Sequence, residues 1–184
     1  MFITSNAHKF REIREIMNSS GIDIIWKKMS YEEIQEDTTE IISLDSARKL
    51  SLMIPEPFFL EDTGLYIDGL GGFPGPYSSY VFKTLGNEGI LKLLAGIPGK
   101  ASFITVVTYF TGKDFLQFKG ELKGSISNNP VGHEGFGYDP IFIPDGYART
   151  LGELSVTDKN MISHRSRAVG KFVEFLKNTE NYGK

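Results

Sequence analysis

The chain has 184 residues, enough for one domain with a sizeable core, and carries a formal charge of -3 with no cysteine. The acidic balance argues against a nucleic-acid partner, and the lack of cysteine excludes disulfides and thiolate zinc sites. No run of about 20 apolar residues and no leader pattern occurs. We therefore expect a cytoplasmic protein with no membrane partner and a single domain over residues 1–184.

Short strands alternate with helices in the first third of the chain. Apolar, β-branched stretches predict strands at residues 2–4, 22–26 and 58–60. Apolar residues at helical spacing predict helices at 10–17 and 41–54.

A long hairpin dominates the rest of the chain. Helical spacing indicates a helix around residues 90–94, and alternating strands at 101–110 and 115–125 flank a turn. A short strand at 141–143 and an amphipathic helix containing 169–176 follow. This order predicts an α/β fold with a mixed, twisted sheet and flanking helices.

The segment from Thr4 to Lys9 joins the first strand to the first helix. A helix N-terminus presents free N–H groups, and its dipole favours an anion. Lys9 in the first turn can reach the same anion. The alternative is an ordinary capped helix with Asn6 as N-cap and Lys9 in solvent.

Glu61 and Asp62 directly follow the strand at 58–60. Carboxylates at a strand end lie where α/β folds place ligands, and hard oxygens suit Mg²⁺. Because neighbouring strand residues point to opposite faces, we expect only one of the pair to face a given site. Glu36 could supply a second carboxylate from a separate segment. The alternative is a solvated strand end before a turn.

The segment G-F-G-Y-D-P places Phe136 between two glycines, which leaves a ring face on which a base can stack. Asp139 precedes a proline, so extended backbone could hold its carboxylate towards the same pocket. The alternative is a turn with Phe136 in the core. The glycine-rich loop at 69–76 lacks the last glycine of a dinucleotide fingerprint, so we expect it to shape a pocket wall or a subunit contact.

Lys159, His164 and Arg165 gather near the start of a predicted helix. Cations there oppose the helix dipole and gain nothing without an anion or ligand. The donors of His164 and Arg165 match carbonyl acceptors and would meet an amino group badly. The alternative is a set of exposed basic residues.

Five motifs in chain order resemble the inosine triphosphate pyrophosphatase (Ham1) family: T-S-N-x-x-K-x-x-E, E-D-T-G-L, F-P-G-P-Y-S, G-F-G-Y-D-P-I-F and K-N-x-I-S-H-R-x-x-A. Each is weak alone, but together they span Thr4 to Ala168. The resemblance implies an elongated, two-lobed α/β fold with a central cleft, usually as a homodimer. It also implies Mg²⁺-dependent hydrolysis of ITP, dITP and XTP to monophosphate and pyrophosphate, which removes deaminated purines from the nucleotide pool.

The resemblance also implies roles for individual residues. Asp62 is the general base and a metal carboxylate, Glu36 is the other metal carboxylate, and Thr63 neighbours the substrate. Phe136 stacks on the purine. The further substrate contacts are Thr4, Ser5, Asn6, Ala7, His8 and Lys9 at the phosphates, Gly137, Tyr138 and Asp139 in the pocket, and Lys159, His164 and Arg165 at the phosphates and the base.

Two departures from the family pattern stand out. Ser46 falls near the place of a family lysine, and Ala7-His8 stands where a glycine is common. Other functions remain open: a Maf-type nucleotide pyrophosphatase of other base specificity, ranked lower because of the S-H-R segment, or a non-catalytic nucleotide-binding protein. A nucleic-acid-binding module ranks third, because it needs a basic stripe.

Overall fold

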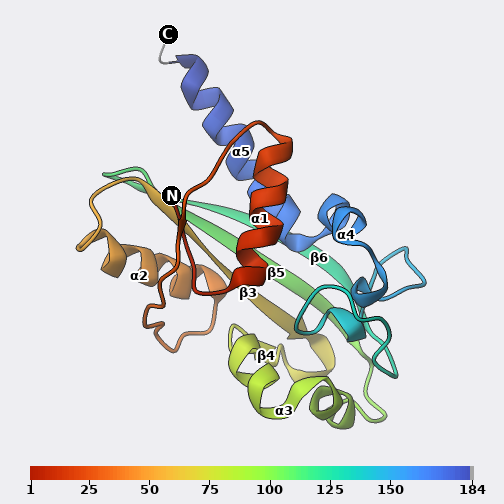
Figure 1. The fold of residues 1–184 in the computed structure, drawn as a ribbon. Helices are drawn as coiled ribbons and strands as arrows, with labels where there is room; N and C mark the ends of the chain where they lie inside the picture. The colour runs from red at the N-terminus through yellow and green to blue at the C-terminus, as the bar shows by residue number, and fades with distance from the viewer. Residues whose placement is uncertain (183–184) are drawn as a thin grey trace.

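Within residues 1–182, which the computed structural model describes, a seven-stranded mixed sheet forms the centre of the fold (Figure 1). The strands are β1 (Phe2–Ile3), β2 (Trp26–Lys27), β3 (Phe58–Ile67), β4 (Pro74–Gly75), β5 (Lys100–Phe110), β6 (Phe115–Ile126) and β7 (Phe142–Pro144). Their order is β2-β1-β3-β5-β6-β7, with β4 added beside β3. β1 runs parallel to β2 and β3, and the other pairings are antiparallel. The predicted mixed α/β sheet is confirmed.

Helices flank this sheet. They are α1 (Ala7–Ser19), α2 (Thr39–Ser51), α3 (Ser78–Leu93), α4 (Val156–Ile162) and α5 (His164–Tyr182), with 3-10 turns η1 (Asp68–Leu70), η2 (Asp139–Ile141) and η3 (Leu151–Glu153). Of these, α1, α2 and α5 cover the two faces of one end of the sheet. Because successive side chains of β3 point to opposite faces, Phe59 packs with α1 and α5, whereas Phe58 and Leu60 pack with α2. None of the helices within residues 1–182 is both long and apolar enough to cross a bilayer.

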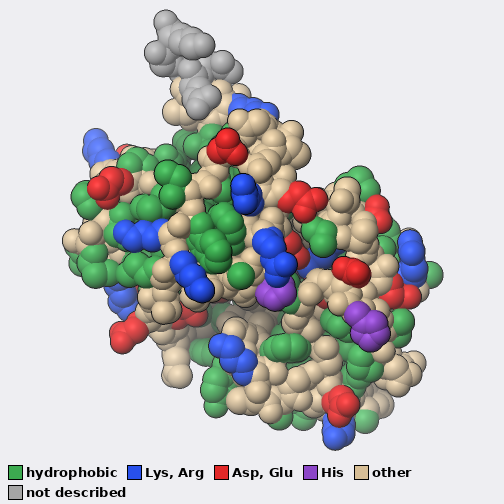
Figure 2. Space-filling view, in the orientation of Figure 1, with side chains coloured by type: hydrophobic (Ala, Val, Ile, Leu, Met, Phe, Trp, Pro, Cys, Tyr) green, Lys and Arg blue, Asp and Glu red, His purple; other side chains and the backbone are tan. Residues whose placement is uncertain are grey.

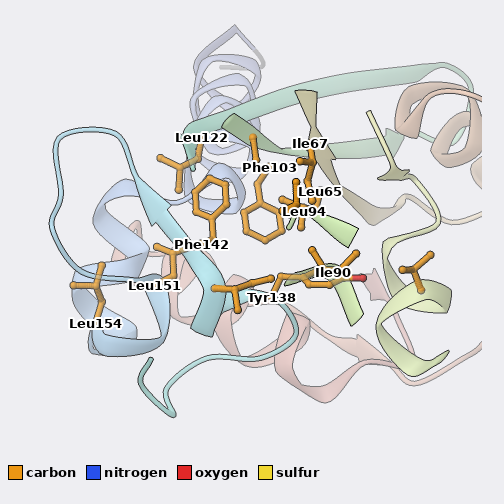
Figure 3. Packing of buried hydrophobic residues seen from close by; sticks show 13 residues of the cluster. Leu65, Ile67, Ile90, Leu94, Phe103, Leu122, Tyr138, Phe142, Leu151 and Leu154 are labelled. Carbon is orange, nitrogen blue, oxygen red and sulfur yellow. The ribbon is translucent and has the colours of Figure 1, made fainter. Parts of the chain in front are cut away.

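A second lobe forms where the long β3, β5 and β6 strands extend beyond α1, α2 and α5. Leu65, Phe103 and Phe142 from the sheet pack there with Ile90 and Leu94, from α3 and its C-terminal end (Figure 3). The Phe103 and Phe142 ring centroids are 4.7 Å apart. Figure 1 shows β4 and α3 at this end, away from α1, α2 and α5. The expected two-lobed shape is therefore present.

The main helices and the hairpin lie where periodicity predicted them, but two strands differ. The strand predicted at 22–26 is confined to β2, because β1 is only two residues long and offers two pairing positions. Ile25 is consequently left 73% exposed. The strand predicted at 58–60 continues to Ile67.

The acidic pair therefore lies within a strand and not at its end. Gly64 does not form a turn: a Cβ there would lie 2.7 Å from the Gly75 carbonyl oxygen, so glycine permits the close approach of β4. β1 pairs with β3 at Phe59, and β4 pairs with the same edge from Leu65 onward. Between these points, no strand within residues 1–182 covers that edge, so side chains on both faces of β3 can reach one cleft.

Candidate active site

A cleft of about 680 Å³ lies where the two lobes meet. It is bordered by the start of α1, the uncovered edge of β3, the start of α3, the loop before η2 and the α4–α5 junction. Figure 2 shows basic side chains and one histidine side chain near a hollow between the two lobes. The predicted site residues that line the cleft are Thr4, Ser5, Asn6, His8, Lys9, Asp62, Thr63, Phe136, Gly137, Tyr138, Asp139, Lys159, His164 and Arg165. Ala7 and Glu36 do not line it.

The start of α1 combines a helix cap with free amides. Asn6 is the N-cap, and its Oδ1 accepts hydrogen bonds from the amides of His8 (2.9 Å) and Lys9 (3.3 Å). The amides of Ser5 and Ala7 have no hydrogen-bond partner in the part of the chain that the structure describes. The predicted Asn6 cap is therefore present, but Lys9 is not in solvent, because its Nζ lies 2.8 Å from Glu61 Oε2. Two N–H donors remain for an anion.

A buried ion-pair network crosses the floor of the cleft. Glu12 of α1 receives Lys159 Nζ at 2.8 Å on one oxygen and Arg165 Nη1 at 2.6 Å on the other. Lys159 also pairs with Asp139 at 2.6 Å, and Arg165 with Glu61 at 3.1 Å. Burial opposes ionisation, but Arg165 and Lys159 hold the pKa of Glu12 below its ordinary value. The two cations are thus engaged inside the protein and are not the free donors expected from the sequence.

Glu61 and Asp62 have opposite electrostatic surroundings. Burial opposes ionisation of Glu61, but Arg165 and Lys9, whose Nζ lies 2.8 Å from Oε2, lower its pKa to about 2. Burial raises the pKa of Asp62 to about 7, with Glu33 and Glu61 adding to the rise and Lys9 opposing it. Asp62 Oδ1 accepts the Thr63 amide at 2.8 Å, whereas the buried Oδ2 has no partner among residues 1–182. An unpartnered acceptor with a pKa near neutrality is typical of a general base or a metal ligand.

Among the acidic residues at positions 32–37, Glu33 lines the cleft and Glu36 does not. The Glu36 side chain is exposed, and its backbone carbonyl accepts a hydrogen bond from the Tyr77 hydroxyl at 3.3 Å. No cluster of three or more His, Cys, Asp or Glu side chains suited to a metal occurs within residues 1–182. Mg²⁺ is commonly held by one or two carboxylates together with substrate phosphates, so Glu33 and the unpartnered oxygen of Asp62 fit such an ion.

Aromatic rings and a neutral histidine form the other end of the cleft. The His164 ring stacks on Phe103 with centroids 4.5 Å apart. His164 is buried, its Nδ1 has no partner in the described chain, and burial lowers its pKa well below the ordinary value. Lys159 Nζ and Arg165 Cζ lie 5.0 and 5.3 Å from the centre of the Phe136 ring. This end can therefore offer an aromatic surface and an uncharged polar ring.

Sequence reasoning assigned no role to Glu12 or Glu33. Glu12 ends the T-S-N-x-x-K-x-x-E motif and sits beside Ile13 on the buried face of α1, and a carboxylate at such a position needs a cation partner. No comparable signal marks Glu33. Ser46 is buried on α2 outside the cleft, and its neighbour Lys49 pairs with Asp45 at 2.7 Å, so neither replaces the family lysine in the cleft.

Comparison with known proteins gives a consistent result. A model of the Ham1 family matches residues 1–175. The chain is 47% identical over 180 residues to the dITP/XTP pyrophosphatase of Methanopyrus kandleri, covering 97% of this chain and 96% of that protein. It is 46% identical over 177 residues to the protein of the same name from Thermococcus kodakarensis, covering 96% of each. The structure of a HAM1 protein from Coxiella burnetii superposes with a TM-score of 0.81 and 27% identity, covering 97% of this chain and 99% of that chain.

Proposed function

Since the chain belongs to the Ham1 family, we propose that it hydrolyses the deaminated purine nucleoside triphosphates ITP, dITP and XTP to the monophosphate and pyrophosphate. The relatives named dITP/XTP pyrophosphatase support this activity. The observation that carries it is the unpartnered Oδ2 of Asp62, placed in a cleft that gathers the predicted phosphate and base segments. The enzyme then clears deaminated purines from the nucleotide pool.

We infer that the reaction uses Mg²⁺. The cleft is lined by four basic side chains, Lys9, Lys83, Lys159 and Arg165, and by four acidic ones, Glu33, Glu61, Asp62 and Asp139. This balance leaves no net positive charge for a triphosphate, so a cation must accompany it. Glu33 and Asp62 would hold the ion, with Glu33 in the role that the family resemblance implies for Glu36. When bound, the ion offsets phosphate charge and polarises phosphoryl oxygens.

Asp62 acts as the general base in the proposed mechanism. Its carboxylate takes a proton from a water molecule whose oxygen forms a bond to the α-phosphorus. The bond from that phosphorus to the oxygen bridging to the β-phosphorus breaks, and its electron pair leaves with pyrophosphate. Lys9 and the free amides of Ser5 and Ala7 stabilise the phosphate charge.

Base selection rests on the neutral ring of His164. A ring N–H donates to the keto oxygen at position 6 of hypoxanthine or xanthine, whereas the amino group of adenine leaves this donor unpaired. Such a mismatch costs about 1–3 kcal/mol. Arg165 helps indirectly, because its guanidinium holds Glu12 and Glu61 and lies against Phe136. Guanine shares the keto group, so this donor does not reject GTP.

We further propose a cytoplasmic homodimer. Phe73, Tyr77 and Tyr80, next to β4 and at the start of α3, have 39%, 39% and 70% of their surfaces exposed. Exposed aromatic side chains gathered in one region favour a protein interface. Light scattering during size-exclusion chromatography should give twice the chain mass, and the mass of one chain would contradict the dimer.

A nucleotide panel tests the proposed function. Pyrophosphate release should be fast with dITP, XTP and ITP, at least about 5-fold slower with ATP, as one unpaired donor implies, and abolished by EDTA. Equal efficiency on ATP and ITP would contradict the proposed base selection. Absence of pyrophosphate release from every purine triphosphate would contradict the function itself.

A further inference from the structure

The side chain of His8 lies against the ring of Phe136. The two ring centroids are 5.2 Å apart with an interplanar angle of 31°, and both residues line the cleft. They come from the start of α1 and from the loop before η2, which are 128 positions apart in the sequence. The amide of His8 is already engaged by Asn6, so the side chain is the part of His8 that remains available to a ligand.

Phe136 is the fixed member of this pair. Its amide donates to Asp139 Oδ2 at 2.7 Å, and that carboxylate is held by the buried Lys159. Lys159 and Arg165 also lie over the ring itself. The position of Phe136 is therefore tied to the ion-pair network.

His8 is the movable member. It is exposed, and its contacts besides the Phe136 ring include a hydrogen bond between its Nδ1 and Arg11 Nη2 at 3.2 Å, which lies on the exposed surface. A flat base held between two rings needs about 7 Å between their centroids, twice a contact distance of ~3.5 Å. The pair must therefore open by about 2 Å from its present spacing, which rotation of an exposed histidine side chain can supply.

We propose that the imidazole of His8 is the second wall of the base site, so that the purine is held between His8 and Phe136. In the free protein the two rings close on each other and cover the surface that the base will occupy. This inference rests on the proposed function for the identity of the base. It makes His8 a substrate-binding residue through its ring, with no role in proton transfer or phosphate contact.

Three substitutions separate ring stacking from hydrogen bonding. His8→Phe keeps an aromatic face without a donor, His8→Asn keeps a donor without a ring, and His8→Ala removes both. The matched control is His133→Ala, because His133 is also exposed but does not line the cleft. Each variant is compared with the unsubstituted protein for the KM and kcat of dITP, the Kd of dIMP, and inhibition by pyrophosphate.

Loss of one stacking face should raise the KM for dITP and the Kd of dIMP about 5- to 100-fold in the alanine and asparagine variants. His8→Phe and the His133 control should stay within about 2-fold of the unsubstituted protein, and kcat and pyrophosphate inhibition should change little in all variants. Retained affinity in His8→Asn with loss in His8→Phe would overturn the proposal, and so would normal dIMP binding by His8→Ala.

The binding measurement keeps this test separate from the proposed function. If the unsubstituted protein releases no pyrophosphate, the function fails, while the dIMP affinities still decide the role of His8. If it binds no dIMP, the proposed base site is wrong. A parallel loss of pyrophosphate inhibition in His8→Ala would indicate damage to the start of α1 and would also overturn the proposal.

Discussion

Replacing Asp62 with asparagine should make the metal-free protein more stable while it removes activity. Burial raises the pKa of Asp62 from 3.8 to about 7, with Glu33 and Glu61 adding to the rise and Lys9 opposing it. Between these two values the folded carboxyl keeps a proton that the unfolded chain has lost. Stability therefore falls as the pH rises through this window, and the full loss is present above pH 7.

The size of the effect follows from the two pKa values. The separation is about 3 units at 1.36 kcal/mol each, so the loss is about 4 kcal/mol. Asparagine is neutral at every pH, and its Oδ1 can still accept the Thr63 amide that Asp62 accepts at 2.8 Å. The variant should therefore exceed the wild type by up to about 4 kcal/mol near pH 8 and equal it near pH 4.

Urea unfolding in EDTA at several pH values measures this difference directly. The same variant should lose about 100-fold or more in pyrophosphate release, the size of a lost general base. Asp37→Asn is the matched control, because Asp37 is exposed and does not line the cleft. A variant no more stable than wild type near pH 8, or a difference independent of pH, would refute the electrostatic reasoning. Near-normal turnover would remove Asp62 from the mechanism.

Three further outcomes are expected. Glu12→Gln should destabilise the protein by about 3–5 kcal/mol in denaturant unfolding, because it leaves two buried cations short of a partner, whereas the exposed Glu15→Gln should stay within about 0.5 kcal/mol. Glu33→Gln should raise the Mg²⁺ concentration needed for half-maximal activity, and Glu36→Gln should not; the reverse order would restore Glu36 as the metal carboxylate. Since burial lowers the pKa of His164, the unfolded chain gains a proton that the folded protein does not as the pH falls below about 6.5, so the His164 contribution to stability falls by up to about 1.4 kcal/mol per pH unit there, opposite in sign to the Asp62 contribution. His164→Asn should abolish this contribution in unfolding measurements at pH 5 to 7, and an unchanged slope would contradict it.

The spacing of apolar residues was sufficient to predict those helices and strands that bury one face. The stripe in α1, with Phe10, Ile13 and Met17 buried, and the alternation in the β5–β6 hairpin follow from helical and strand periods. The extent of β3 was not predictable in the same way. Gly64 reads as a turn signal in sequence, and only the approach of β4 shows why glycine is needed in an extended strand.

The sequence predicted which segments form the candidate site, but it did not predict the ion pairs between their side chains. Motif order placed Asp62 and His164 in one cleft, and both line it. The sequence could not show that Arg165 pairs with Glu12 and Glu61, because these partners are more than 100 positions away and meet only through the packing of α1, β3 and α5. Of the two donors expected to contact the base, Arg165 is therefore paired with carboxylates inside the protein. His164 Nδ1 has no partner among the described residues.

A single competition reaction tests the proposed hydrolysis most directly. Equal amounts of dITP, dGTP and dATP are incubated with the protein and Mg²⁺ in water labelled with heavy oxygen, and the products are separated by mass spectrometry. We expect dIMP carrying the label together with unlabelled pyrophosphate, while dATP is largely intact. Label in pyrophosphate instead of dIMP, or dAMP formed as fast as dIMP, would contradict attack at the α-phosphorus or the reading of the base.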